Sequence, residues 1–137
     1  MSESFHRKVR KYFSLDKLLP EDDLRQRLNL QHKPCADAFC HRRNCDHIVI
    51  EKKGNDTRGA IKQLEVTCKA LRLREGINVK ECILIADKVE KRFYRVVDHQ
   101  LYLKLGNKPI HILDNIPVIK IRPSELLKPP LDYWRSK

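Results

Sequence analysis

Hydrophobic residues recur along this chain with two spacings, one typical of helices and one typical of strands. The helical spacing is clearest in residues 57–74, where apolar side chains fall at i, i+3, i+7 and i+10. These side chains are Ile61, Leu64, Cys68 and Leu71. They predict a helix that is capped by Asp56 or Thr57, ends near Arg74 and buries one stripe of its surface.

Strand-like stretches lie on both sides of this helix. Residues 36–40 and 45–53 predict two strands joined by a polar turn at residues 41–44. Residues 80–87 contain a continuous apolar run, which is typical of a central strand covered on both faces. A strand, a helix and a second buried strand imply a right-handed crossover, so we expect 45–53 and 80–87 to pair in parallel.

The N-terminal residues predict helices. Apolar side chains share one side of a helix over residues 4–13, and basic residues fill its other faces. Ser14 is expected to cap a further turn through Leu19. Pro20 then suits the first position of a helix through Leu30, and its acidic first turn at residues 21–23 complements the helix dipole.

The C-terminal part of the chain predicts four short strands and a tail. The strands fall at residues 93–97, 100–105, 109–113 and 118–121. They extend the sheet in antiparallel or mixed fashion, and residues 123–125 begin a last short helix or turn. We therefore expect one α/β domain over residues 1–128, with a mixed central sheet flanked by helices, and a loosely held tail at 129–137.

The charge of the chain favours a polyanionic partner. Its 29 lysines and arginines against 18 acidic residues give a net charge of +11, which points chiefly to nucleic acid, although solubility alone is the alternative. The residues expected to hold backbone phosphates are Arg7, Lys8, Arg10, Lys11, Arg42 and Arg43. No run of about 18 apolar residues is present and the N-terminus lacks a signal sequence, so we expect a cytoplasmic protein with no membrane partner.

The strand at residues 45–53 ends in Glu51-Lys52-Lys53 before Gly54. Because strand side chains alternate, Glu51 and Lys53 share one face and Lys52 lies on the other. The acid and the ammonium form a plain ion pair, or they belong to a metal-dependent phosphodiester site. Such a site needs an activated water and charge neutralisation, which a carboxylate-bound Mg²⁺ and a nearby cation supply together.

A second carboxylate can join Glu51 if the two strands form a hairpin. A hairpin across residues 41–44 carries Asp37 towards the end of the sheet that holds Glu51. Asp46 is nearer in sequence, but an odd spacing from Glu51 directs it to the opposite face. We therefore expect Asp37 to be the partner of Glu51.

Asp37, the Glu51-Lys52-Lys53 element and a following helix with Gln63 resemble the PD-(D/E)XK phosphodiesterase superfamily, which includes many restriction enzymes and Holliday junction resolvases. The resemblance covers roughly residues 20–90 and implies a restriction-endonuclease-like core with extra C-terminal antiparallel strands. That family also places a strand between its first helix and the aspartate, for which residues 31–35 leave little room.

The resemblance assigns roles to these residues. It implies that Asp37 and Glu51 bind Mg²⁺ or Mn²⁺, that Lys53 activates water or stabilises the transition state, and that Gln63 is an accessory polar group. The family often has a glutamate on its first helix, and Glu21 is the candidate for this third metal ligand, although the helix dipole explains it equally well.

The function implied is a metal-dependent endo- or exodeoxyribonuclease that hydrolyses phosphodiester bonds in DNA, and related enzymes often act as homodimers. One alternative is a catalytically inactive module of the same fold that binds nucleic acid. Another is a zinc-stapled interaction protein in which Glu51 and Lys53 merely pair.

Cysteines and histidines are concentrated in residues 32–47. The candidate ligands of a structural zinc or an iron–sulfur cluster are Cys35, Cys40, Cys45 and His47. Their spacing differs from the paired Cys-X2-Cys of common zinc sites, and a pair of half-buried thiols is the alternative. Cys68 and Cys82 lie in apolar runs and are expected in the core.

Overall fold

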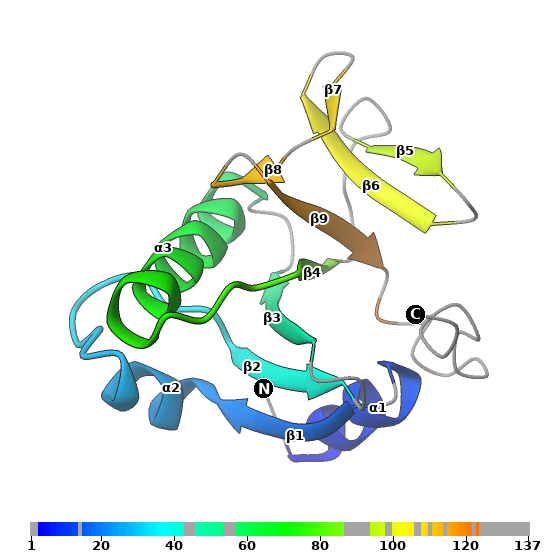
Figure 1. Ribbon diagram of the computed structural model, residues 1–137. Helices are drawn as coiled ribbons and strands as arrows, with labels where there is room; N and C mark the ends of the chain where they lie inside the picture. Colours follow the sequence, from blue (N-terminus) through cyan, green and yellow to red (C-terminus); the bar gives the residue numbers. More distant parts are fainter. Residues whose placement is uncertain are drawn as a thin grey trace.

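A computed structural model describes the chain at residues 3–13, 15–42, 46–53, 57–86, 94–97, 100–105, 108–109, 111–113, 115–121 and 123. Figure 1 shows a central sheet with α1 (Glu3–Phe13) on one face. The other face is covered by α2 (Glu21–Arg27) and α3 (Thr57–Glu75). The protein is therefore an α/β structure with a mixed sheet flanked by helices, as the sequence predicts.

The sheet is built from nine strands in the described residues. They are β1 (Leu15–Pro20), β2 (Ala38–Arg42), β3 (His47–Lys53), β4 (Glu81–Ala86), β5 (Tyr94–Val97), β6 (Gln100–Leu105), β7 (Lys108–Pro109), β8 (His111–Ile112) and β9 (Ile116–Ile121). The order is β1-β2-β3-β4-β9-β6-β5, with β7 paired to β6 and β8 paired to β9.

The pairing changes direction in the middle of the sheet. Strands β1, β2 and β3 are antiparallel, whereas α3 crosses over so that β4 runs parallel to β3. Strand β9 is also parallel to β4, while β6 is antiparallel to both β9 and β5. The C-terminal strands therefore extend the sheet in mixed fashion.

The two faces of the sheet bury separate hydrophobic cores. Ile48 and Ile50 of β3 pack with α1, while Val49 between them packs with α2 and α3. Strand β4 is buried along its whole length, as expected for a central strand covered on both faces. This alternation decides which side chains of β3 share the face towards α3.

Strand β1 differs from the expected helical turn after Ser14. Residues 15–20 are extended and pair with β2, with Leu18 opposite Cys40 and Leu19 opposite Phe39. Leu18 packs on the α1 side and Leu19 on the α3 side. The prediction was wrong because pairing with a distant strand outweighs the local preference of a short segment.

Helix α2 is shorter than predicted. Pro20 ends β1 with extended angles and serves as the N-cap, and the helix stops at Arg27 instead of Leu30. The chain then turns through Asn29, whose φ is 54°, and the N–H of Leu30 donates to the carbonyl of Arg25. This bond gives a partner to a carbonyl that the helix end would otherwise leave without one.

Helix α3 confirms the predicted stripe. Leu64, Cys68 and Leu71 are buried, and the helix ends one residue beyond the expected Arg74. Gly76 follows with a φ of 65°, a left-handed conformation that glycine adopts without steric cost. The N–H of Ile77 donates to the carbonyl of Leu71 at 3.2 Å, which closes the helix end.

The other strand limits lie close to those expected. Strand β2 begins two residues later than predicted. Of the predicted strand at 109–113, Pro109 belongs to β7 and residues 111–112 form β8. The predicted tail at 129–137 lies outside the described residues. Within the described part of the chain, no helix has the length and apolar character needed to cross a membrane.

Candidate active site

The hairpin register brings Asp37 and Glu51 to the same end of the sheet. Ala38 pairs with Ile50, Asp37 directly precedes Ala38, and Glu51 directly follows Ile50. Asp37, just outside β2, and Glu51, within β3, therefore lie at the same end of the hairpin. The sequence prediction that Asp37 approaches Glu51 depended on this register.

The side chain of Asp37 reaches across to the backbone of β3. Its Oδ2 atom accepts a hydrogen bond from the N–H of Lys52, with 2.6 Å between oxygen and nitrogen. A carboxylate that accepts from a backbone N–H is held in one orientation by a charge-assisted bond. Asp37 is thus fixed beside the residue that follows Glu51.

Glu51 is a buried acidic residue. Only 1% of its surface is exposed, and it shares the face of Val49 towards α3. Lys52 points to the opposite face, where its Nζ atom lies 4.5 Å from the centre of the Phe5 ring. The parity argument for Lys52 is therefore confirmed.

Asp46 lies at the other end of β3. Its Oδ2 atom is 3.5 Å from Nζ of Lys80, beside the point where β4 begins. Asp46 therefore has an ion-pair partner of its own, at the opposite end of β3 from Asp37 and Glu51. The choice of Asp37 over Asp46 agrees with this arrangement.

Lys53 is described only by its backbone. It lies in β3 and pairs with Ala86 at the end of the parallel ladder with β4. Its side chain lies outside what the structure describes, so the role expected of its ammonium group stays a prediction.

Gln63 lies on α3, the helix that covers the face of Glu51. Its Oε1 atom is buried and, among the described residues, has no hydrogen-bond partner. A buried amide oxygen without a partner costs about 1–3 kcal/mol. Such a group marks a place where a polar ligand or an ordered water would be stabilised.

Thr67, one turn after Gln63, joins α3 to the segment before β2. Its hydroxyl donates to the carbonyl of Gln63 at 2.8 Å and accepts the N–H of Ala36 at 2.8 Å. Ala36 directly precedes Asp37. Thr67 therefore fixes the helix that carries Gln63 against the chain that carries Asp37.

Sequence reasoning did not single out Thr67. The available signal was a polar residue four positions after Gln63 on the buried side of the predicted helix. Its partner Ala36 is far away in sequence, so only the fold identifies what the hydroxyl binds.

Glu21 follows Pro20, which pairs with Ala38 at the same end of the sheet. Its Oε2 atom is 3.1 Å from a guanidinium nitrogen of Arg25, one turn further along α2. Arg25 also donates to the carbonyls of Leu30 and Lys33 and so holds the connection to β2. Glu21 thus has a structural partner of its own.

The pKa of the Cys35 thiol is affected by the charges of both Glu21 and Glu51. Burial raises its pKa to about 11; Arg25 and a hydrogen bond with Thr67 lower this pKa, and the charges of Glu21 and Glu51 raise it. Both carboxylates therefore act electrostatically at the position of Cys35.

The predicted cysteine cluster is divided between the two cores. Cys35 packs on the α3 side and Cys40 on the α1 side, where burial raises the Cys40 pKa to about 12. Cys45 lies outside the described residues. The two described thiols thus lie on opposite faces of the sheet and cannot bind one ion together.

His47 belongs to a cluster of rings on the α3 face. It stacks on Phe39 with 5.5 Å between ring centres, and its ring centre lies 4.5 Å from that of His41. Burial lowers the pKa of His47, and the neighbouring His41 and Arg27 lower it further, against the opposing effect of Asp46.

The basic residues expected to hold phosphates are arranged unevenly. Arg7, Lys8 and Lys11 of α1 are exposed, but α1 covers the face of the sheet opposite Glu51. Arg10 donates to the backbone carbonyl of Asp16 at 3.0 Å. The side chain of Arg42 and all of Arg43 lie outside what the structure describes.

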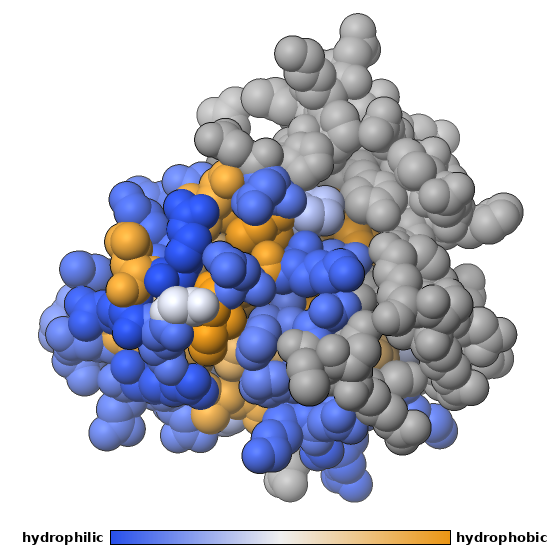
Figure 2. Space-filling model, in the orientation of Figure 1, coloured by the Kyte–Doolittle hydropathy of each residue, from blue (hydrophilic) through white to orange (hydrophobic). Residues whose placement is uncertain are grey.

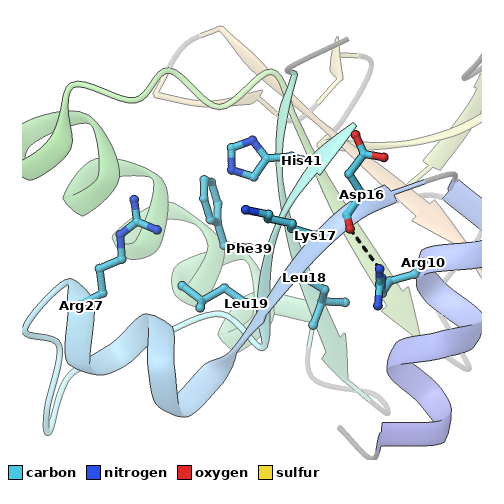
Figure 3. A pocket seen from close by; sticks show the side chains of 8 residues that line it. All are labelled: Arg10, Asp16, Lys17, Leu18, Leu19, Arg27, Phe39 and His41. Atoms are coloured by element: carbon cyan, nitrogen blue, oxygen red, sulfur yellow. Dashed lines mark hydrogen bonds between the residues drawn. The ribbon is translucent and has the colours of Figure 1, made fainter. Parts of the chain in front are cut away.

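A hollow of about 330 Å³ lies beside the edge strand β1. Its basic side chains come from three elements: Arg10 of α1, Lys17 of β1 and Arg27 of α2. Figure 3 shows the Lys17 ammonium group and the rings of Phe39 and His41 turned towards the same space. Sequence analysis missed this group because its members are far apart in the chain.

The described surface on one face of the molecule is mainly polar. On the face shown in Figure 2, hydrophilic residues cover most of the described surface, and hydrophobic side chains show as patches between them. This face therefore suits a polar or charged ligand.

Asp37 and Glu51 offer carboxylate oxygens, the ligand type that a hard cation such as Mg²⁺ prefers. Mg²⁺ retains several waters and binds through one or two carboxylates together with substrate phosphates. The acids of Asp37 and Glu51 match that demand. Within the described part of the chain, no group of three or more histidine, cysteine or acidic side chains is arranged to hold a metal ion.

Comparison of the chain with protein-family models, curated proteins and solved structures found no match.

Proposed function

We propose that this protein is a metal-dependent nuclease of the PD-(D/E)XK type that hydrolyses phosphodiester bonds in DNA. The observation that supports it best is the pairing of Ala38 with Ile50, which leaves Asp37 and Glu51 at the same end of the hairpin, with the Asp37 carboxylate accepting the N–H of Lys52. Two acids at one sheet end, beside the predicted catalytic lysine, are the arrangement that the sequence pattern requires.

The order of elements gives a second line of support. The superfamily places a strand between its first helix and the aspartate, and β1 occupies that place here. Strands β1, β2 and β3 are antiparallel, and α3 then leads to the parallel strand β4. With α1 as the first helix, Glu21 of α2 follows β1 and no longer lies on the first helix, which counts against its role as a third metal ligand.

Each residue has a part in the proposed reaction. A bound Mg²⁺ would lower the pKa of a water and neutralise charge on the phosphate. Asp37 and Glu51 would hold the ion, with Asp37 oriented by the Lys52 N–H and Glu51 in a buried setting that strengthens its attraction for a cation. Lys53 would stabilise the anionic transition state, and Gln63 would bind a water or a phosphate oxygen.

The direct test is incubation of the protein with plasmid and with branched DNA in Mg²⁺ or Mn²⁺. Cleavage by the wild type and its loss in Lys53→Ala and Glu51→Gln would support the proposal. No cleavage by the wild type, or equal cleavage by Lys53→Ala, would exclude it. Salt-sensitive binding without cleavage, unchanged by magnesium, would instead support the inactive binding module.

A further inference from the structure

We propose that Lys17, Arg27 and His41 form a binding site for a backbone phosphate of nucleic acid, at the far end of the sheet from Asp37 and Glu51. The inference deepens the proposed nuclease function and depends on it for the identity of the ligand. In this proposal, the hollow beside β1 binds the same DNA strand that is cut at the end of the sheet where Asp37 and Glu51 lie.

The three side chains converge from separate elements. Lys17 is an exposed residue of β1, Arg27 lies at the end of α2, and His41 lies on β2. All three side chains line the hollow, and in Figure 3 they lie around the Phe39 ring, with Arg27 on one side of it and Lys17 on the other. Such a group of fixed donors is suited to an oxyanion.

Two of the donors, His41 and Arg27, are held in place by neighbours. The His41 ring lies against Phe39 and His47, with ring centres 5.4 Å and 4.5 Å apart. Arg27 donates from Nε and Nη2 to one oxygen of Glu75, at the end of α3. A guanidinium has five N–H donors, so others remain for a ligand.

The position of the hollow fits a strand of DNA that extends from the carboxylates. His47, in ring contact with His41, shares the face of Glu51 and lies four residues before it on β3. Four residues of strand span about 13 Å, and successive phosphates of one duplex strand are ~3.4 Å apart along the axis. The hollow is therefore about four nucleotides from the proposed scissile bond.

The inference also supplies cations that the face of Glu51 requires. The basic side of α1 is separated from Glu51 by the sheet, because α1 packs on the opposite core. Lys17 and Arg27 lie on the face of the sheet that α2 and α3 cover. They are better placed than α1 to bind phosphates of a DNA strand that runs along this face to the carboxylate site.

Matched charge variants test the site. Binding of a short fluorescein-labelled DNA duplex would be measured by anisotropy in EDTA, over a range of salt concentrations, so that cleavage plays no part. Lys17→Gln would be compared with Lys69→Gln, which removes the same charge from an exposed position on α3. Loss of one phosphate contact should lower the slope of log K against log salt by about 0.9 in Lys17→Gln alone.

A second pair of variants should change affinity in the opposite direction. Glu75→Gln removes the carboxylate that competes for Arg27 and should strengthen DNA binding several-fold, relative to Glu65→Gln at an exposed position on the same helix. If the two variants of each pair bind DNA with the same affinity and the same salt dependence, the phosphate site is wrong, whether or not the wild type cuts DNA. A selective effect without any cleavage would support the site and would count against the nuclease proposal alone.

Discussion

The Asp37 carboxylate accepts the backbone N–H of Lys52 across the β2–β3 hairpin, with 2.6 Å between the two atoms. This bond links the acid that precedes β2 to the residue that follows Glu51. It gives Asp37 a structural role in addition to the catalytic role proposed here, and substitutions can separate the two.

Asp37→Asn should lose cleavage and keep the fold. The amide oxygen of the new side chain can still accept the Lys52 N–H, but the substitution removes the negative charge that is proposed to hold the cation. We expect DNA cleavage to fall by about a hundredfold or more, with the free energy of unfolding lowered by about 1 kcal/mol or less. Urea unfolding and a plasmid cleavage assay would measure these two effects.

Asp37→Ala serves as the control because it removes the hydrogen bond as well as the charge. It should destabilise the protein by about 1.5–3 kcal/mol, the usual contribution of a hydrogen bond to a charged group. Full cleavage by Asp37→Asn would show that the carboxylate has only the structural role.

Gln63→Leu should reduce cleavage without destabilising the protein. The buried Oε1 atom has no hydrogen-bond partner among the described residues, so an apolar side chain of similar size removes a desolvated polar group. We expect stability to be unchanged or raised by about 1 kcal/mol. Thermal unfolding and cleavage kinetics would be compared with the wild type, and a large loss of stability would assign Gln63 to the fold.

Thr67→Val should destabilise the protein. The new side chain has the same shape but leaves the N–H of Ala36 buried without its acceptor, at a cost of about 1–3 kcal/mol. Thr67→Ser keeps the hydroxyl and should lose less. If urea unfolding gives the two variants equal stability, the link between α3 and the chain before Asp37 contributes little.

The Cys40 thiol should make stability fall at alkaline pH. Burial raises its pKa from 9.0 to about 12, so the folded state keeps the proton over a range in which the unfolded chain releases it. The stabilisation is complete below pH 9.0 and is lost as pH rises towards about 12. Each pH unit in this range lowers the free energy of unfolding by about 1.4 kcal/mol.

Cys40→Ala tests this effect by its slope, because the substitution also leaves a small cavity. Urea unfolding at pH 8 and pH 10 should show a decrease that is smaller in Cys40→Ala than in the wild type, by about 1.4 kcal/mol. Equal decreases would show that Cys40 ionises at its ordinary pKa in the folded protein.

The sequence was informative where local pattern and burial agree. The stripe Leu64, Cys68 and Leu71 and the continuous run of β4 specify their elements, because each needs a fixed periodicity to reach a core. The hairpin that carries Asp37 and Glu51 to one end of the sheet was predicted from two strand patterns and the polar residues between them, which are local properties.

The tertiary structure decided what depends on distant partners. Residues 15–20 have no strong pattern and became a strand because the free edge of β2 offers hydrogen bonds. Thr67 and Ala36 are far apart in the chain, as are Lys17, Arg27 and His41, so no spacing connects them. The sequence by itself determined the hairpin and crossover that carry the carboxylates. Packing across the sheet decided which polar and basic side chains surround them, because burial and charge act through space.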